Sequence, residues 1–97
     1  MAVEVHDTRL LGRLVRRVRR AMGLTQIELA RLAGLGERFI VDLERGKSTC
    51  EIGKVLEVMS MLKLRMIVEP PAEIPTADLE TDLPRPRRPR RTPKTAL

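Results

Sequence analysis

The sequence of 97 residues contains no tryptophan and no tyrosine, and Phe39 is its only phenylalanine. Modules that bind RNA or single strands commonly stack bases on aromatic side chains, so this composition argues against them. The single cysteine, Cys50, excludes an intrachain disulfide and a cysteine-rich zinc site. We interpret Cys50 as a small, inert residue, because no histidine or second cysteine lies near it in the sequence.

Long apolar runs are also missing, so we expect neither a signal peptide nor a membrane span, and a cytoplasmic location follows by default. The only histidine, His6, lies in an N-terminal stretch without clear periodicity. The sequence has no Ser/His/Asp set, no glycine-rich phosphate loop and no metal-ligand spacing. We therefore expect no enzyme, no metal site and no cofactor.

Proline is absent from the first 69 residues, and all seven prolines lie from Pro70 onward. This change in composition predicts a folded domain at residues 8–69 and a Pro/Arg-rich tail at residues 70–97. A domain of this size has a marginal core, and small domains often gain stability by forming oligomers. The net charge of +6 suits a polyanionic partner, although charge alone does not select duplex DNA.

Residues 8–22 carry the pattern of an amphipathic helix. Its apolar stripe recurs at helical spacing through Leu11, Leu14, Val15, Val18 and Met22. The opposite face carries the arginines Arg9, Arg13, Arg16, Arg17 and Arg20. Two interpretations of this face stay open: it is simply solvated, or some of its arginines approach phosphates.

Residues 24–47 are predicted to form two short helices joined by a glycine turn. Thr25 and Glu28 match a capping box that begins the first helix, and the glycines of residues 34–36 end it. A glycine at position 46 ends the second helix. The expected apolar positions are Ile27, Leu29, Ala30 and Leu32 in the first helix, and Phe39, Ile40 and Leu43 in the second. Two helices with such a turn form a helix-turn-helix, whose second helix can lie in the DNA major groove.

The motif is also recognisable by its residue pattern, which includes Thr25-Gln26, Leu29-Ala30, Gly34, Ile40 and Leu43-Glu44-Arg45-Gly46-Lys47. This residue pattern resembles that of the Xre/Cro group of helix-turn-helix regulators. Within that group, the run from Arg38 to Ile40 followed by the run from Leu43 to Lys47 resembles the HipB-type antitoxins. The resemblance covers roughly residues 11–68. It implies an all-α, lambda-repressor-like bundle of four to five helices, with a short C-terminal dimerisation strand and a disordered tail.

The same resemblance implies that Arg19 pairs with Glu44 and ties the first helix to the second half of the motif. We interpret this pair as structural and not as a DNA contact. If it is buried, removing one partner costs about 3–5 kcal/mol, because the other charge is left uncompensated.

A DNA-binding surface is predicted around the second helix of the motif. Gln26 is expected to bond a phosphate, as the family's glutamine does here, or else is a simple first-turn residue. Arg38 is the best candidate for base reading, because a guanidinium matches guanine O6 and N7, and Val41 is placed for a thymine methyl. Arg45 and Lys47 are placed for phosphates, or else are merely solvated.

Three residues depart from the usual pattern of the family. Gly36 stands where a serine or threonine commonly caps the reading helix, at a cost of only a few tenths of a kcal/mol. Glu37 and Asp42 are acidic where many relatives are neutral or basic. These carboxylates either accept from cytosine N4 and enforce specificity, or pair with Arg38 or nearby arginines and hold them in place.

A further helix is expected after the motif. Ser48 and Glu51 match a second capping box at its start, which puts Cys50 in its first turn. The buried stripe of this helix is expected to comprise Ile52, Val55, Leu56, Met59 and Leu62.

Residues 64–69 are predicted to form a short strand that has no partner within the chain. An unpaired strand edge leaves backbone hydrogen bonds unmade, so we expect pairing with the same strand of a second copy across a twofold axis. The dimerisation residues would be Leu64, Met66, Ile67 and Val68. The alternatives are a frayed fifth helix or an apolar extension packed on its own domain.

The tail from Pro70 contains an acidic stretch and then the basic run PRPRRPRRTPK, a composition that cannot form a core. Three interpretations stay open. The tail is an uninformative solvated segment, its basic end lies along DNA phosphates or in a minor groove, or it folds onto a protein partner.

These observations lead to one main hypothesis. The chain is expected to be a homodimeric, sequence-specific repressor of operator DNA, associated with the nucleoid, and the antitoxin partner of a HipA-like kinase toxin. The alternatives are a stand-alone Xre-type transcription factor, and a protein-interaction module that keeps the fold but uses its basic tail on a protein.

Overall fold

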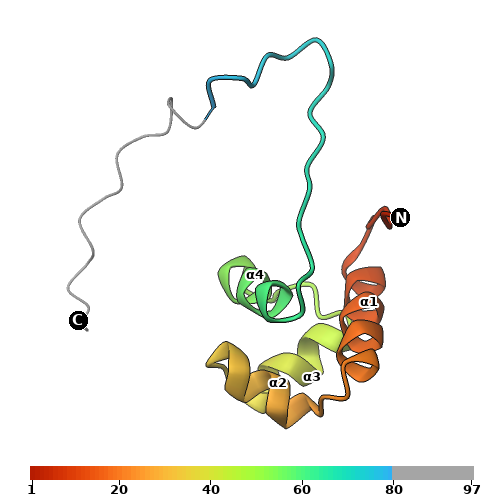
Figure 1. The fold of residues 1–97 in the computed structure, drawn as a ribbon, viewed down its shortest axis with the longest axis vertical. Coiled ribbons are helices and arrows are strands. Elements are labelled where there is room, and N and C mark those ends of the chain that lie inside the picture. Colours follow the sequence, from red (N-terminus) through yellow and green to blue (C-terminus); the bar gives the residue numbers. More distant parts are fainter. Residues whose placement is uncertain (80–97) are drawn as a thin grey trace, which may run out of the picture. The chain divides into compact units, whose positions relative to one another are not determined.

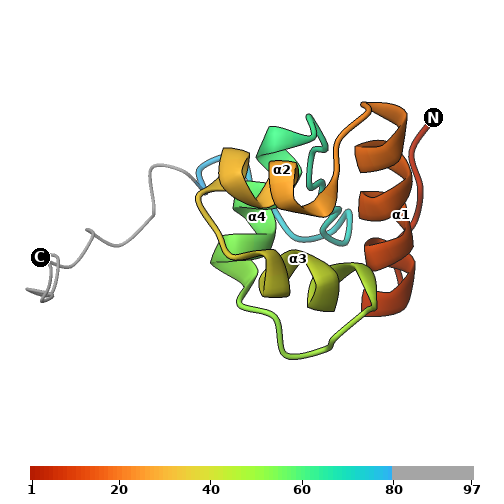
Figure 2. The ribbon, with the colours of Figure 1, turned by 90° about the horizontal axis from the view of Figure 1, so that it is seen from below.

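The computed structural model describes residues 1–79, and within them it contains four helices. They are α1 (Thr8–Ala21), α2 (Gln26–Ala33), α3 (Glu37–Glu44) and α4 (Ile52–Met61). Helix α3 packs against α1 and α2, and α4 packs against α2 (Figure 1). The C-terminal end of α3 lies beside α1 (Figure 2). The predicted all-α fold is confirmed, and none of these four helices is long and apolar enough to cross a membrane.

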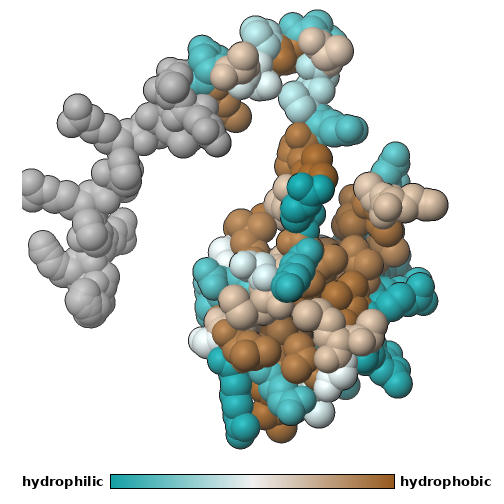
Figure 3. All heavy atoms as spheres, in the orientation of Figure 1, coloured by the Kyte–Doolittle hydropathy of each residue, from teal (hydrophilic) through white to brown (hydrophobic). Residues whose placement is uncertain are grey.

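The core lies where the four helices meet. Its fully enclosed side chains are Val15, Leu29, Ile40 and Val58, joined by Ala30, Leu43, Val55, Met59 and Leu62. The predicted apolar faces of α1, α2 and α4 included too many residues. Five of the residues expected to be buried are exposed: Met22, Ile27, Leu32, Ile52 and Leu56. Each short helix is covered by its neighbours on one side only, so apolar positions at the flanks of a stripe still face solvent. Hydrophobic side chains therefore reach the surface among hydrophilic ones (Figure 3).

All four helices end in a left-handed residue, which is a glycine in three cases. Gly23, Gly34 and Gly46 have φ angles of 76°, 71° and 87°. After each, a backbone N–H returns to a carbonyl five residues earlier, as in Leu35 N to Ala30 O at 2.8 Å. Lys63 ends α4 in the same way with φ 59°, so a residue with a side chain holds a conformation that favours glycine.

The expected start of α4 was wrong. Its first residue is Ile52 and its N-cap is Glu51, without a side-chain capping bond. Ser48 lies in a turn before the helix, too far upstream to cap it, and Cys50 is in the connecting loop. By contrast, Thr25 and Glu28 form both bonds of the predicted capping box, at 3.0 and 2.8 Å.

The expected strand at residues 64–69 was also wrong, because this segment forms no strand in the described part of the chain. A ladder needs a second strand, and residues 1–79 offer none to pair with it. Met66, Ile67 and Val68 are exposed, and Leu64 packs partly against the core. The division between residues 69 and 70 stays a prediction, and the basic end of the tail lies outside the described residues.

Candidate nucleic-acid interface

One face of helix α3 packs into the core, and the opposite face is directed toward solvent. Ile40 and Leu43 are buried in the core, while Glu37 and Arg38 are exposed and Val41 is half-buried. The outward residues Glu37, Arg38, Val41 and Asp42 lie at i, i+1, i+4 and i+5, a spacing that places them on one side of a helix. The predicted reading residues therefore share a face that is directed away from the core.

The start of α3 is capped by its backbone only. Gly36 is the N-cap and makes no side-chain capping bond, as its lack of a side chain dictates. Glu37, in the first turn, forms no ion pair or hydrogen bond within the described chain. Its negative charge lies at the positive end of the helix dipole, where a carboxylate is stabilising. Glu37 thus has a local role that does not depend on DNA.

Asp42 is the centre of a small charge cluster on the outward face. Its Oδ1 accepts from Arg38 Nη2 at 2.9 Å, and its Oδ2 lies 3.5 Å from Lys47 Nζ. The Asp42 side chain is only 18% exposed, whereas that of Arg38 is 73% exposed. The pairing considered from the sequence is thus confirmed for Asp42. Two cations offset the carboxylate, and the ion pair directs the exposed Arg38 side chain along the outward face of α3.

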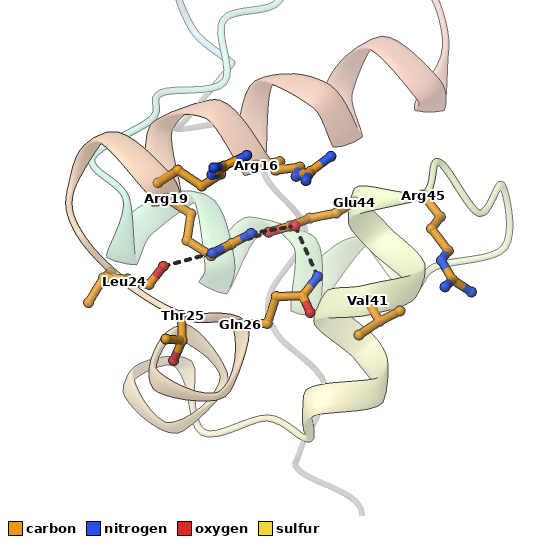
Figure 4. Close-up of a pocket in the computed structure, with 9 residues that line it drawn as sticks. Arg16, Arg19, Leu24, Thr25, Gln26, Val41, Glu44 and Arg45 are labelled. Carbon is orange, nitrogen blue, oxygen red and sulfur yellow. Dashed lines mark hydrogen bonds and ion pairs between the residues drawn. The ribbon is translucent and has the colours of Figure 1, made fainter.

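A buried ion pair connects α1 to the last residue of α3. Arg19 Nε and Nη2 donate to Glu44 Oε2 and Oε1 at 2.6 and 3.0 Å, and Nη1 donates to the Leu24 carbonyl at 2.7 Å (Figure 4). The two side chains are 9% and 3% exposed. The predicted pair is therefore confirmed as a structural link between three segments of the chain.

Gln26 lies in the first turn of α2 and joins the same network. Its Nε2 donates to Glu44 Oε1 at 3.1 Å, a bond that the sequence did not indicate (Figure 4). An amide nitrogen carries two hydrogens, so one N–H remains for another acceptor. The bond to Glu44 fixes the direction in which that second hydrogen points.

An open groove of about 670 Å³ adjoins this network. It is lined by Arg16, Arg19, Arg20, Leu24, Thr25, Gln26, Val41, Glu44 and Arg45. Three of its arginines come from α1. Arg16 and Arg20 belong to the arginine face for which the sequence left two interpretations open, solvation or phosphate binding, and Arg19 is the partner of Glu44. The groove brings α1, the first turn of α2 and the end of α3 to one place (Figure 4).

Gly12 positions α3 against α1, and sequence reasoning missed it. A Cβ at this residue would lie 2.4 Å from the Leu43 carbonyl oxygen and 2.7 Å from that of Glu44. Only glycine allows the two backbones to approach so closely. A glycine inside a helix costs up to about 1 kcal/mol relative to alanine. The presence of Gly12 in the middle of a predicted amphipathic helix could therefore have indicated a close backbone contact.

Within residues 1–79, Cys50 and Asp7 have shifted pKa values. Burial and the nearby Asp42 carboxylate raise the pKa of the Cys50 thiol, although Lys47 opposes them. This direction favours the protonated, less reactive thiol and agrees with the inert role expected from the sequence. The Leu10 N–H bond to the Asp7 cap, at 2.8 Å, lowers the pKa of that carboxyl group. Among residues 1–79, no three acidic, histidine or cysteine side chains are grouped to hold a metal ion.

Comparison with known proteins identifies the class of this chain. The profile of the helix-turn-helix family HTH_3 matches residues 15–65, which is more than half of the sequence. The chain therefore belongs to the Xre-type helix-turn-helix family, whose members are DNA-binding transcriptional regulators and not enzymes.

A particular relative is the "Uncharacterized HTH-type transcriptional regulator y4mF" of Sinorhizobium fredii (strain NBRC 101917 / NGR234). It is 48% identical over 73 residues, which cover 75% of this chain and 96% of the relative. Among solved structures, those described as "HipB-O4 20mer complex" and "Structure of HipA-HipB-O2-O3 complex" each match with a TM-score of 0.66 and 22% identity. Each match covers 71% of this chain and 97% of the other. At this level of identity the solved structures support the fold.

Proposed function

We propose that this regulator is a homodimeric repressor that reads operator DNA in the major groove with the outward face of α3. The observation that carries the proposal is the Arg38–Asp42 pair at 2.9 Å on that face. A guanidinium held by a carboxylate keeps free N–H groups for guanine O6 and N7, and it loses little side-chain entropy on binding. Gln26, Arg45 and Lys47 would then contact phosphates on either side of the helix.

The reading role of Arg38 is tested by selecting tight-binding duplexes from a random library and titrating them by fluorescence anisotropy. Arg38→Ala should cost about 1–3 kcal/mol on the selected duplex and much less on a scrambled one. Asp42→Asn should lower discrimination between the two duplexes, because Arg38 is no longer held. Glu57→Gln is the matched control, since it removes an exposed carboxylate of α4, which lies outside the outward face of α3. Equal weakening on both duplexes for Arg38→Ala would show that Arg38 does not read bases.

A homodimer is supported by the apolar side chains that the single chain leaves exposed. Met66, Ile67 and Val68 are 48%, 64% and 77% exposed, and they follow the half-buried Leu64. Consecutive exposed apolar residues of this kind mark interaction surfaces. A twofold axis through this segment would present two copies of α3 to half-sites about 34 Å apart.

The dimer is tested by light scattering and sedimentation at micromolar concentration. Ile67→Asp should produce monomers that keep their helices, because the side chain is mostly exposed in the single chain. Arg65→Asp makes an acidic change at an exposed polar residue of the same segment and is the control for charge. A wild-type chain that is already monomeric would contradict the proposal.

We further propose that the chain is the antitoxin of a HipA-like kinase toxin and represses its own operon. Two observations support this proposal: the residues from Arg38 to Lys47 resemble those of HipB-type antitoxins, and a solved structure of the same fold is described as a HipA-HipB-O2-O3 complex. A neighbouring reading frame for such a kinase, and its recovery with the chain from native cells, would support the partnership. An isolated gene with no kinase recovered would count against it. DNA binding would place the protein in the cytoplasm, at the nucleoid.

A stand-alone Xre-type transcription factor is the second candidate. It is favoured by the relative from Sinorhizobium fredii, whose description is of a transcriptional regulator and whose length is almost fully covered. If this second function is correct, the DNA-binding experiments should give the same results, and no kinase should be recovered with the chain.

A further inference from the structure

The turn that follows α3 is held against the start of α1. Thr8 Oγ1 donates to the Gly46 carbonyl oxygen at 2.7 Å, a bond between residues 38 positions apart. A Cβ at Gly46 would lie 2.7 Å from the Cα of Arg9, so the backbone of the first turn of α1 lies directly against this glycine. Figure 2 shows the end of α3 beside the start of α1. Contacts from outside the helix-turn-helix therefore determine where the turn lies.

The peptide bond that joins Gly46 to Lys47 is hydrogen-bonded at both of its polar groups. Its carbonyl oxygen accepts from Thr8 Oγ1, and its N–H donates to the Asp42 carbonyl oxygen at 3.0 Å. The peptide therefore keeps one orientation, because rotating its plane would leave both groups without a protein partner. Asp42 Oδ2 also lies 3.5 Å from Lys47 Nζ, and the Lys47 side chain is 53% exposed. Lys47 thus extends toward solvent from a backbone that is fixed on both sides.

We infer that Thr8 is a positioning residue for DNA binding, which acts through the Gly46 carbonyl to aim Lys47 at a backbone phosphate. The inference rests on the proposed DNA-binding function, in which Lys47 contacts a phosphate. Thr8 itself touches neither base nor phosphate in this arrangement. The ammonium group of a lysine is a point charge on a flexible stem, so its contribution depends on where its backbone is held.

The test compares two changes at Thr8 in the full-length chain. Thr8→Val removes the hydroxyl and keeps the shape of the side chain, whereas Thr8→Ser keeps the hydroxyl. Thr76→Val is the matched control, because Thr76 is exposed and its hydroxyl forms no hydrogen bond within residues 1–79. Circular dichroism and urea unfolding verify that the helices are retained. Fluorescence anisotropy then measures affinity for the selected and the scrambled duplex at several salt concentrations.

Thr8→Val should lower affinity by about 2- to 10-fold, which corresponds to the loss of one hydrogen bond. The factor should be the same on both duplexes, because a phosphate contact carries no base sequence. The slope of log K against log salt should fall in magnitude by about 0.9 for each phosphate that is no longer neutralised. Thr8→Ser and Thr76→Val should match the wild type in affinity and in slope. If Thr8→Ser lost as much affinity as Thr8→Val, the hydroxyl would not be the positioning group and the inference would fail.

A double-mutant cycle with Lys47→Gln separates positioning from a purely structural role. Lys47→Gln alone should lower affinity and the salt slope, and Thr8→Val should then have almost no further effect. Equal weakening by Thr8→Val in both backgrounds would mean that Thr8 acts through stability or through its own phosphate contact, which overturns the inference. Unchanged binding in Lys47→Gln would also overturn it, while base reading by Arg38 stands. A wild-type chain that binds neither duplex would overturn both the inference and the proposed function.

Discussion

Replacing Gly12 by alanine should destabilise the fold, although alanine is the better helix former. The added Cβ would lie 2.4 Å from the Leu43 carbonyl oxygen and 2.7 Å from the Glu44 carbonyl oxygen. Ordinary contact between such atoms begins at about 3.4 Å, so α1 would have to move away from α3 by about 1 Å. The obstacle is backbone, which cannot turn aside as a flexible side chain would.

The size of the effect follows from two opposing contributions. Overpacking of this kind costs typically about 1–3 kcal/mol, and a contact with backbone belongs at the upper end. The higher helix propensity of alanine returns up to about 1 kcal/mol. The net loss should be about 2 kcal/mol, which lowers the Tm of a domain this small by roughly 8–16 °C.

The assay is thermal and urea unfolding followed by far-UV circular dichroism at one fixed protein concentration. Gly53→Ala is the matched control, because Gly53 lies in α4 and a Cβ there meets nothing within 4 Å. This control should be stabilised by about 0.5 kcal/mol. If Gly12→Ala matched or exceeded the wild type in stability, the close approach of α1 to the end of α3 would be refuted.

Three further predictions concern the ends of the helices. Gly36→Ser should stabilise the fold by a few tenths of a kcal/mol, because the serine supplies the missing side-chain cap of α3 and a Cβ at this position meets nothing within 4 Å. Urea unfolding measures the change, and a loss of stability would contradict the prediction. Lys63→Gly should stabilise by about 1 kcal/mol, because φ is 59° there, and an unchanged Tm would argue against the left-handed end of α4. Asp7→Ala should lower stability at neutral pH by removing the bond from Leu10 N–H. Because the folded pKa of Asp7 is lowered from 3.8, this contribution is present above that value and is lost as the pH falls through the lowered pKa. Wild type and Asp7→Ala should therefore converge in an acid titration of stability, and a constant gap would contradict the capping role.

The motif was predictable because its signals are local in sequence. A capping box at Thr25 and Glu28, and glycines at positions 34 and 46, fix where the helices begin and end whatever packs around them. The Arg19–Glu44 pair was predictable only through the family resemblance, since its partners are 25 residues apart and spacing alone does not bring them together.

The remaining features depend on which surfaces meet in three dimensions. Apolar residues such as Leu32 and Ile52 fit a helical stripe, but no neighbouring helix covers them, and the sequence does not contain that information. Ser48 matched a capping pattern, yet the chain continued through a turn before α4 began. The bond from Gln26 to Glu44 and the groove beside it arise only when α1, α2 and α3 are assembled.

The claim that α3 reads guanine through Arg38 is tested most directly by a double-mutant cycle between protein and DNA. Each guanine of the selected half-site is replaced in turn by 7-deazaguanine, which lacks the N7 acceptor, and wild type and Arg38→Ala are titrated on every duplex. At one guanine, the replacement should weaken wild-type binding by about 1–3 kcal/mol and leave Arg38→Ala almost unaffected. Equal weakening of both proteins at every guanine would contradict the claim.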